Sequence, residues 1–99
     1  MINSNVLLSV QRALLGNITS NLRAVYVLIE NETTFKLIFY YDHELTDEEE
    51  ELASLTDTEF LSDFPSPNYN TSYEIYVLGY PKDIPKTGIC VYKRFENYC

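Results

Sequence analysis

The residue best suited to acid–base catalysis at neutral pH is the single histidine, His43, which lies between Asp42 and Glu44. A Ser–His–Asp or Cys–His arrangement would have to use it. The sequence places no nucleophile beside it, and HELTD lacks the second histidine of the HExxH zinc motif. We therefore expect no enzymatic activity, and we keep a small enzyme that uses His43 with Asp42 or Glu44 only as a third hypothesis.

The acids around His43 also have to be considered as metal ligands. An EF-hand calcium loop needs alternating oxygen ligands, a central glycine and a terminal glutamate. Asp42, Glu44 and Thr46 alternate, but no glycine follows them, and the next acids belong to a predicted helix on which adjacent carboxylates diverge. One histidine and two cysteines do not suit a zinc site, and three glycines form no phosphate-binding loop. The sequence predicts no metal and no cofactor.

Charge is the strongest functional signal in the sequence. Residues 42–63 hold ten of the fifteen acids and none of the seven lysines and arginines, so the rest of the chain has five acids against seven bases. A field of one sign steers partners of the opposite sign. The net charge of −8 and the pI near 4.4 argue against direct binding to nucleic acid or to an anionic membrane, which requires clustered bases.

Part of this acidic stretch has a local explanation. Residues 46–49, TDEE, match a capping box, and acids in a first helical turn suit the positive end of the helix dipole. The remaining acids have no base four residues away to compensate them, so their mutual repulsion is left standing. A solubilising face is the simpler explanation, but such a face usually mixes both signs. We predict that a basic partner contacts Asp42, Glu44, Glu48, Glu50, Glu51, Asp57, Glu59 and Asp63.

Tyrosines flank the acidic stretch on both sides. The chain has nine tyrosines and no tryptophan, and Tyr40 and Tyr41 precede the stretch while Tyr69 follows it. Tyrosine is enriched at the centres of protein interfaces, although strand tyrosines also fit a half-buried sheet. We add Tyr40, Tyr41 and Tyr69 to the predicted partner-binding surface.

The first half of the chain predicts a helix and a hairpin. Residues 5–15 carry apolar side chains at helical spacing, and Gly16 suits a left-handed C-terminal cap. Residues 22–30 and 34–41 are rich in β-branched and aromatic residues and are joined by a short polar turn. Both faces of residues 34–41 contain apolar side chains, which indicates partial cover on both sides or an interaction surface.

The second half predicts a helix and two strands. The acidic helix is expected to begin at Thr46 and to end at Pro65. Its predicted core face consists of Leu52, Ala53, Thr56, Phe60, Leu61 and Phe64. Residues 73–80 and 88–95 are predicted strands, with a bulge at Gly79 and with Cys90 buried. We expect one α+β domain over residues 1–99, with a four-stranded, mostly antiparallel sheet and both helices packed on one face.

Several segments together resemble a known family. LLSVQRALLG at 7–16, NLRAV at 21–25, FYYD at 39–42, the acidic helix and DFP at 63–65 are similar to small bacterial immunity proteins of contact-dependent growth inhibition and polymorphic toxin systems. The resemblance covers most of the chain, and its motifs are typical of a fold and not of a catalytic site. It implies an α+β domain that neutralises a toxin, commonly a nuclease, in the cytoplasm. No binding residue is carried over from it.

Two functions therefore stand ahead of the enzyme. The first is a cytoplasmic immunity protein that binds and neutralises a cognate nuclease toxin domain through its acidic and tyrosine-rich surface, without binding nucleic acid itself. The alternative is an α+β adaptor or homodimer unrelated to toxins, which the apolar second face of residues 34–41 suggests. The N-terminus lacks the basic region of a signal peptide, and no apolar run reaches the length of a membrane span. The identity of the toxin and the oligomeric state are left open.

Overall fold

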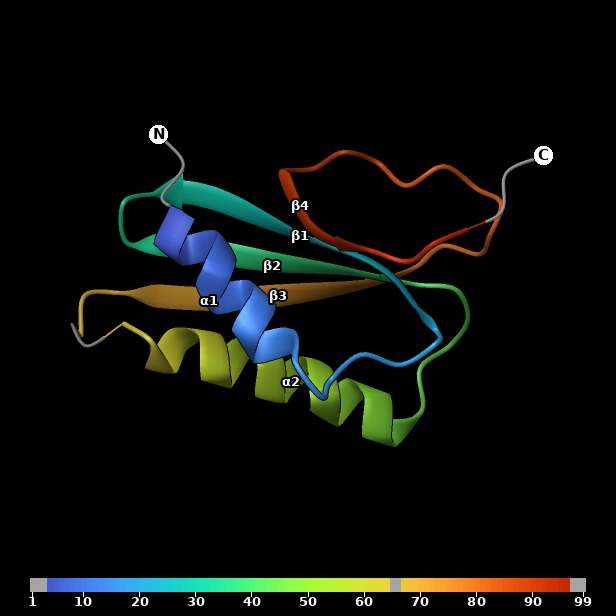
Figure 1. The fold of residues 1–99 in the computed structure, drawn as a ribbon, viewed down its shortest axis with the longest axis horizontal. Helices are drawn as coiled ribbons and strands as arrows, with labels where there is room; N and C mark the ends of the chain where they lie inside the picture. The colour runs from blue at the N-terminus through green and yellow to red at the C-terminus, as the bar shows by residue number, and fades with distance from the viewer. Residues whose placement is uncertain (1–3, 65–66, 97–99) are drawn as a thin grey trace.

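The computed structural model describes residues 4–64 and 67–96, and its elements follow the predicted order of helix, two strands, helix and two strands (Figure 1). The acidic helix begins one residue later than predicted, and its predicted end at Pro65 lies outside the described residues. The elements are α1 (Ser4–Leu14), β1 (Leu22–Asn31), β2 (Thr34–Tyr41), α2 (Asp47–Ser62), β3 (Asn70–Val77) and β4 (Ile89–Lys93).

The central pair of strands is the predicted hairpin. β1 and β2 pair antiparallel, with Val25 opposite Phe39 and Val27 opposite Leu37. The turn between them is closed by the side chain of Asn31, whose Oδ1 accepts a hydrogen bond from the backbone N–H of Thr33 at 2.9 Å. β4 pairs antiparallel with the other side of β1.

The prediction of a mostly antiparallel sheet is wrong, because β3 lies parallel to β2. Leu37 is opposite Tyr73 and Phe39 is opposite Ile75 in this pair, and the strand order is β3-β2-β1-β4. Parallel neighbours need a crossover connection, usually a helix, and α2 is that connection. The sequence-based expectation of a mostly antiparallel sheet took no account of the helix between residues 34–41 and 73–80, which allows these strands to pair in parallel.

The position of β3 differs from the prediction as well. The strand covers Asn70–Val77 instead of residues 73–80, since the backbone N–H of Asn70 donates to the carbonyl of Thr33 at 2.8 Å and starts the parallel ladder. Gly79 therefore follows the strand and forms no bulge within it. A Cβ atom at Gly79 would lie 3.3 Å from the carbonyl oxygen of Asp42, so a small residue suits this close approach.

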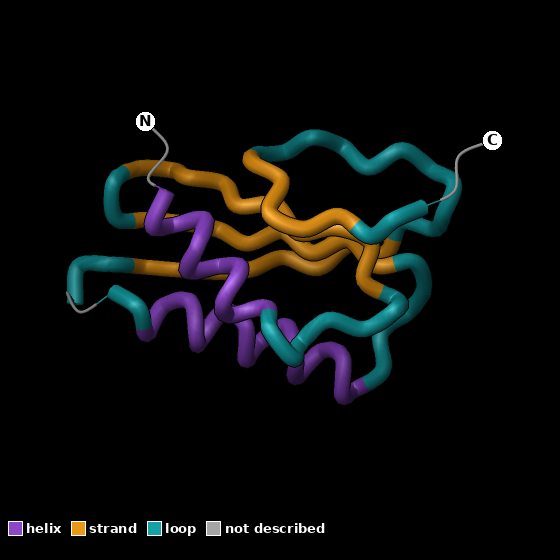
Figure 2. Tube along the Cα trace, in the orientation of Figure 1, coloured by secondary structure: helices purple, strands orange, loops and turns teal. Residues whose placement is uncertain are grey.

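One buried cluster joins both helices to one face of the sheet. α1 contributes Val6, Val10, Ala13 and Leu14, α2 contributes Ala53 and Phe60, and the strands contribute Leu22, Val25, Val27, Phe35, Leu37, Phe39 and Tyr41. Figures 1 and 2 show α1 crossing the strands and α2 running along β3. Of the predicted core face of α2, Ala53, Thr56 and Phe60 are buried, Leu52 and Phe64 are half-buried, and Leu61 is exposed.

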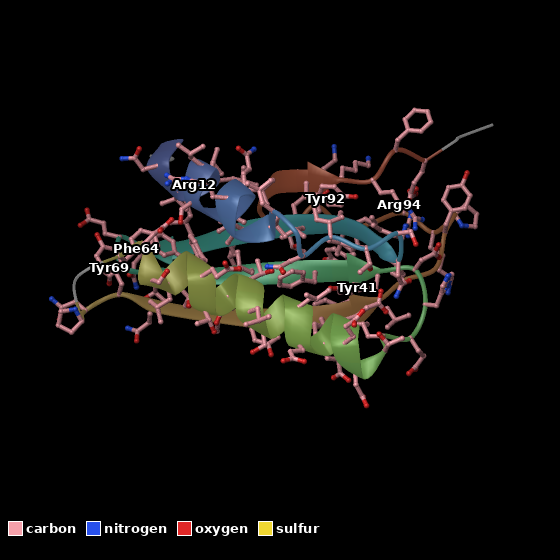
Figure 3. The ribbon with its side chains drawn as sticks, turned by 60° about the horizontal axis from the view of Figure 1, so that its bottom comes forward. Arg12, Tyr41, Phe64, Tyr69, Tyr92 and Arg94 are labelled. Carbon is pink, nitrogen blue, oxygen red and sulfur yellow. The ribbon has the colours of Figure 1, made fainter. Side chains whose placement is uncertain are left out.

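A stack of aromatic rings closes the end of this core where α2 finishes. The rings of Phe64 and Tyr69 lie 4.6 Å apart, and Phe35 lies 5.4 Å from Phe64. Figure 3 shows Phe64 and Tyr69 side by side at this end of the molecule. The loop after α2 is thereby attached to β2 by stacking, which places the start of β3 beside the start of β2.

The other face of the sheet has a smaller cluster and no helix. Ala24, Tyr26, Ile38 and Tyr40 are buried there, and Leu28, Leu78 and Ile84 pack against them. Ile84 belongs to the crossing segment, residues 78–88, which leads from β3 to β4. Gly88 ends this segment at a point where a Cβ atom would lie 2.5 Å from the carbonyl oxygen of Val27, so only glycine fits.

The expectation of a buried Cys90 is wrong, because this side chain is exposed. β4 is a short strand at the edge of the sheet. Its neighbours Ile89 and Val91 pack on the helix-covered core, and side chains alternate between faces along a strand, so Cys90 points to the opposite, open face. The apolar run around Cys90 indicated a strand correctly but not that the strand lies at an edge.

A charged network fixes the strand ends beside Asp42. The Arg23 side chain, 1% exposed, donates to both carboxylate oxygens of Glu96 at 2.7 and 2.8 Å and to the carbonyl of Leu78 at 2.6 Å. Arg94 joins Glu96 at 2.8 Å and Asp42 at 3.1 Å. The network connects β1, the segment after β4, the end of β3 and the turn before α2.

We expect Arg23→Ala to lower the free energy of unfolding by about 3–5 kcal/mol, because it leaves the Glu96 carboxylate buried without its main partner. Urea denaturation at pH 7 measures the change. Lys36→Ala is the matched control, since Lys36 forms a surface pair with Glu74 and its loss should leave the unfolding free energy close to that of the parent. Equal losses in the two variants would contradict a structural role for the buried pair.

Candidate functional site

The start of α2 is built as the sequence predicts. Thr46 is the N-cap residue, and its hydroxyl accepts a hydrogen bond from the backbone N–H of Glu49 at 3.1 Å. The Glu49 carboxylate in return accepts from the backbone N–H of Thr46 at 3.1 Å. The capping box is therefore confirmed, and it fixes the direction in which the first turn of α2 leaves the sheet.

Glu49 does more than cap the helix. Its carboxylate also accepts from the Thr19 hydroxyl at 2.6 Å and from the Asn21 side chain at 3.2 Å, so it ties α2 to the loop before β1. Burial acts to raise the pKa of Glu49, but the hydrogen bonds from Thr19, Thr46 and Asn21 outweigh it and lower this pKa below its ordinary value. One acid of the run is thus structural and does not face solvent.

Four exposed acids surround Glu49 on the first turns of α2. Asp47, Glu48, Glu50 and Glu51 all face solvent, as does Glu44 just before the helix. No base lies on α2 to offset them. Leu55, one turn after Glu51 on the same side of the helix, is 44% exposed. We call Glu44, Asp47, Glu48, Glu50, Glu51 and Leu55 the acidic surface.

Three of the other predicted acids form hydrogen bonds that hold parts of the fold together. Asp42 belongs to the charged network, and hydrogen bonds from the Tyr80 amide and Arg94 outweigh its partial burial and lower its pKa. Glu59 accepts from the Asn17 side chain at 3.0 Å, and Asp63 accepts from the Ser9 hydroxyl at 2.5 Å. The Glu59 contact joins α2 to the turn after α1, and the Asp63 contact joins the end of α2 to α1. Both acids remain exposed at this end of the helix.

Asp57 lies in a less favourable environment. Its Oδ1 atom is buried and has no hydrogen-bond partner among the described residues, and the same holds for the hydroxyl of Thr71 on β3. Burial raises the pKa of Asp57, and the nearby Thr71 side chain offsets only part of that rise. The charged form of Asp57 is therefore disfavoured where α2 meets β3.

The three predicted tyrosines are not gathered beside the acids. Tyr41 is buried in the helix-covered core, where burial, reinforced by Glu49, raises its pKa to about 12. Tyr69 belongs to the aromatic stack at the other end of α2 (Figure 3). Tyr40 is buried on the opposite face of the sheet, with its hydroxyl 3.2 Å from that of Thr87. Adjacent residues in a strand point to opposite faces, which separates Tyr40 from Tyr41.

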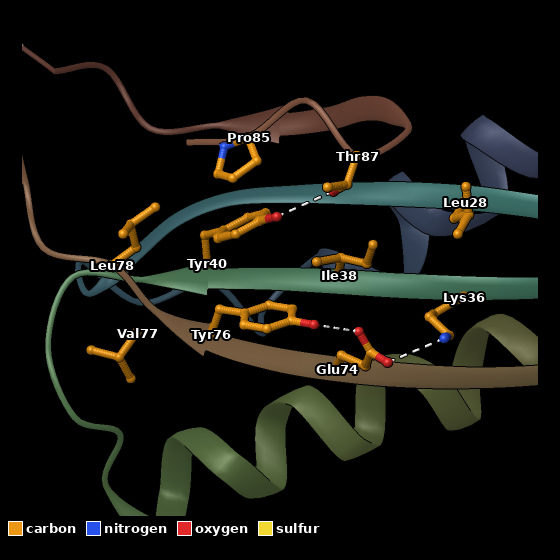
Figure 4. A pocket seen from close by; sticks show the side chains of 10 residues that line it. All are labelled: Leu28, Lys36, Ile38, Tyr40, Glu74, Tyr76, Val77, Leu78, Pro85 and Thr87. Atoms are coloured by element: carbon orange, nitrogen blue, oxygen red, sulfur yellow. Dashed lines mark hydrogen bonds and ion pairs between the residues drawn. The ribbon is translucent and has the colours of Figure 1, made fainter. Parts of the chain in front are cut away.

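Sequence reasoning missed a groove on the open face of the sheet. Its volume is about 450 Å³, and Figure 4 shows its lining. The lining residues are Leu28, Lys36, Ile38, Tyr40, Glu74, Tyr76, Val77, Leu78, Pro85 and Thr87. The apolar second face of residues 34–41 signalled that something covers or contacts this face, but the parallel β3 and the crossing segment that form the walls were not predicted.

His43 lies in the loop between β2 and α2. It is exposed, and its backbone N–H and carbonyl both bond to the Asn21 side chain. Within residues 4–64 and 67–96, no three histidine, cysteine or acidic side chains converge so that they could hold a metal ion. No helix in this part of the chain is long and apolar enough to span a membrane.

Comparison with known families identifies the chain. The family model described as MafI2 immunity protein matches residues 3–96, which is nearly the whole length. A comparison with curated proteins finds no match. The chain belongs to the MafI2 immunity protein family, which confirms the resemblance to small immunity proteins of polymorphic toxin systems.

We expect Glu49→Gln to lower the free energy of unfolding at pH 7 by about 1–2 kcal/mol, because it weakens the helix cap and the link to Thr19. A carboxylate whose pKa falls on folding stabilises the protein above its ordinary pKa of about 4.3, and this contribution disappears as the pH drops toward the lower folded pKa. The difference between variant and parent should therefore shrink at pH 3. Urea denaturation at both pH values tests this, with the exposed neighbour Glu48→Gln as control; a pH-independent loss would contradict it.

Asp57→Asn should have the opposite effect. A carboxyl whose pKa rises on folding costs stability above its ordinary pKa, so removing its charge should raise the unfolding free energy at pH 7 and change little at pH 3. Thermal unfolding at the two pH values measures this. Asp83→Asn, in the exposed crossing segment, is the control, and a lower midpoint for Asp57→Asn at pH 7 would show that the charge is favourable where it lies.

Proposed function

We propose, from membership of the MafI2 immunity protein family, that the chain neutralises one cognate toxin domain in the cytoplasm by binding it stoichiometrically, without catalysing a reaction. The toxin is expected to be a nuclease, as in many systems of contact-dependent growth inhibition. The observation that carries the proposal is the acidic surface, where five acids face solvent around the start of α2 and no base of that helix offsets them.

Charge complementarity supports a basic partner. A nuclease grips phosphates with clustered lysines and arginines, so its active site carries a positive field. The acidic surface can lie in or beside such a site, where it accelerates association and excludes partners of the wrong charge. An immunity protein has to reach its toxin before the toxin reaches its substrate, so a fast association rate is directly useful.

The rigidity of α2 supports the same proposal. The capping box and the three hydrogen bonds to the Glu49 carboxylate hold the first turn in place, so the exposed acids need little ordering when a partner binds. Affinity also needs an apolar anchor, because surface charge alone contributes mainly to rate and specificity. Leu55 provides one such anchor beside Glu51 and Glu48.

The predicted partner-binding residues take different roles in this proposal. Glu44, Glu48, Glu50 and Glu51 contact the toxin, and Glu59 and Asp63 extend the contact toward the end of α2. The remaining predicted residues are held within the fold and are not assigned to the contact made by α2: Asp42, Asp57, Tyr40, Tyr41 and Tyr69.

One observation favours an alternative, an adaptor or homodimer unrelated to toxins. The groove of about 450 Å³ on the open face is lined largely by apolar side chains and is available for a partner of any origin. Light scattering separates this alternative: a stable homodimer that survives addition of the toxin domain would favour it over the immunity role.

We expect the double variant Glu48→Lys and Glu51→Lys to slow association with the cognate toxin domain by about tenfold or more at low salt, and to weaken the salt dependence of the rate. Stopped-flow mixing or biolayer interferometry with the cognate toxin domain measures both. Glu30→Lys with Glu32→Lys is the matched control, because it makes the same charge change at exposed residues at the end of β1 and in the turn that follows. Equal slowing by both double variants would mean that only net charge matters, and unchanged binding would remove the acidic surface from the proposal.

A further inference from the structure

The crossing segment divides the open face of the sheet into two hollows. On one side lies the groove, which Pro85 and Thr87 border. On the other side lies a second hollow of about 510 Å³, the basic hollow, which Ile84 and Lys86 border. Because Ile84 is anchored on the buried cluster beneath it, the segment forms a fixed ridge between the two.

The groove offers apolar contact and no unsatisfied polar group at its floor. The Tyr40 hydroxyl pairs with Thr87, and the Tyr76 hydroxyl donates to Glu74 at 2.7 Å (Figure 4). Glu74 is in turn paired with Lys36 at 3.1 Å. The rings of Tyr40 and Tyr76 stack with their centroids 5.6 Å apart, so the surface they present is aromatic. Such a groove suits an apolar side chain of a partner.

The basic hollow has the opposite character. Lys82, Lys86 and Lys93 line it, and Asp83 is the one acid among its described lining residues. Arg23 also lines it, but the Arg23 guanidinium is held by Glu96. Lys82 and Lys86 lie four residues apart in the crossing segment, and the return of the chain brings them to the same hollow as Lys93 of β4. The hollow therefore suits carboxylates of a partner, whereas the acidic surface suits lysines and arginines.

The groove and the acidic surface of α2 both border β3, which places them within reach of one partner. Glu74 and Tyr76 of β3 line the groove, and Figure 4 shows α2 running along β3 beyond that strand. Contacts between α2 and β3 hold the two in place. A partner that wraps the β3 edge of the sheet can contact α2 with one region and the open face with another.

We infer that the open face is a second docking surface for the toxin domain, and that it takes a toxin segment with an apolar side chain next to acidic residues. The inference rests on the proposed function. The apolar side chain enters the groove, and the carboxylates meet the lysines of the basic hollow across the ridge. Since the two surfaces carry opposite charge, they fix the orientation of the toxin, because a reversed toxin would place acid on acid and base on base.

Two single substitutions test the two halves of this surface. Lys86→Glu should weaken the equilibrium affinity for the cognate toxin domain by about tenfold or more at low salt, and less at high salt. Val77→Asp, at a groove residue that is 48% exposed, should weaken it by a similar factor at both salt concentrations, because the lost contact is apolar. Isothermal titration calorimetry measures the affinities, and circular dichroism checks that each variant is folded.

Matched controls come from the outer side of α1. Arg12→Glu makes the same charge change as Lys86→Glu, and Leu8→Asp replaces a side chain that is 49% exposed, as Val77 is. Both controls should stay within about threefold of the parent, which is the range of ordinary surface changes. If Lys86→Glu and Val77→Asp also stay within that range while the reversal at Glu48 and Glu51 weakens binding, the inference is wrong and the proposed function stands.

Two further outcomes would also overturn the inference. If light scattering shows that the free chain is a dimer and that Val77→Asp dissociates it without changing toxin affinity, the groove is an interface between two copies of this chain. If the parent protein does not bind the toxin domain at all, the proposed function fails, and the second docking surface fails with it.

Discussion

The parallel pairing of β2 and β3 is the constraint on which the rest of the structure depends. It requires α2 as a crossover, which turns Ala53 and Phe60 toward the core and leaves the acids of the first turns outside. It also leaves β3 at one edge and β4 at the other, both running in the same direction as β2. The chain therefore has to run back over the open face between them, and residues 78–88 form the ridge between the groove and the basic hollow.

Elements whose causes are local could be predicted from the sequence. The capping box at residues 46–49, the hairpin of β1 and β2, and the order of helices and strands all follow from near neighbours in the chain. The direction and start of β3 could not, since they depend on pairing with β2 through contacts 36 residues apart, such as Leu37 with Tyr73. The exposure of Cys90 depends likewise on β4 being an edge strand, which composition does not reveal.

In the candidate site, too, features with local causes were predicted and features that depend on distant contacts were not. Exposed acids at the start of α2 follow from helical spacing and were predicted, but the burial of Glu49 depends on Thr19 and Asn21 in a distant loop. The predicted tyrosines do not lie together, because side chains alternate between the two faces of a strand and Tyr40 and Tyr41 therefore point to opposite faces of the sheet. The basic hollow was not predicted, because Lys93 of β4 joins Lys82 and Lys86 of the crossing segment only through the return of the chain to β4.

The central claim is that the start of α2 contacts the toxin. Hydrogen–deuterium exchange of the chain, alone and bound to the cognate toxin domain, tests this most directly because it maps the contact without altering any residue. The account predicts slower exchange in the first turns of α2 in the complex, together with β3 and the crossing segment if the open face also docks. Protection confined to α1, with unchanged exchange in α2, would contradict it.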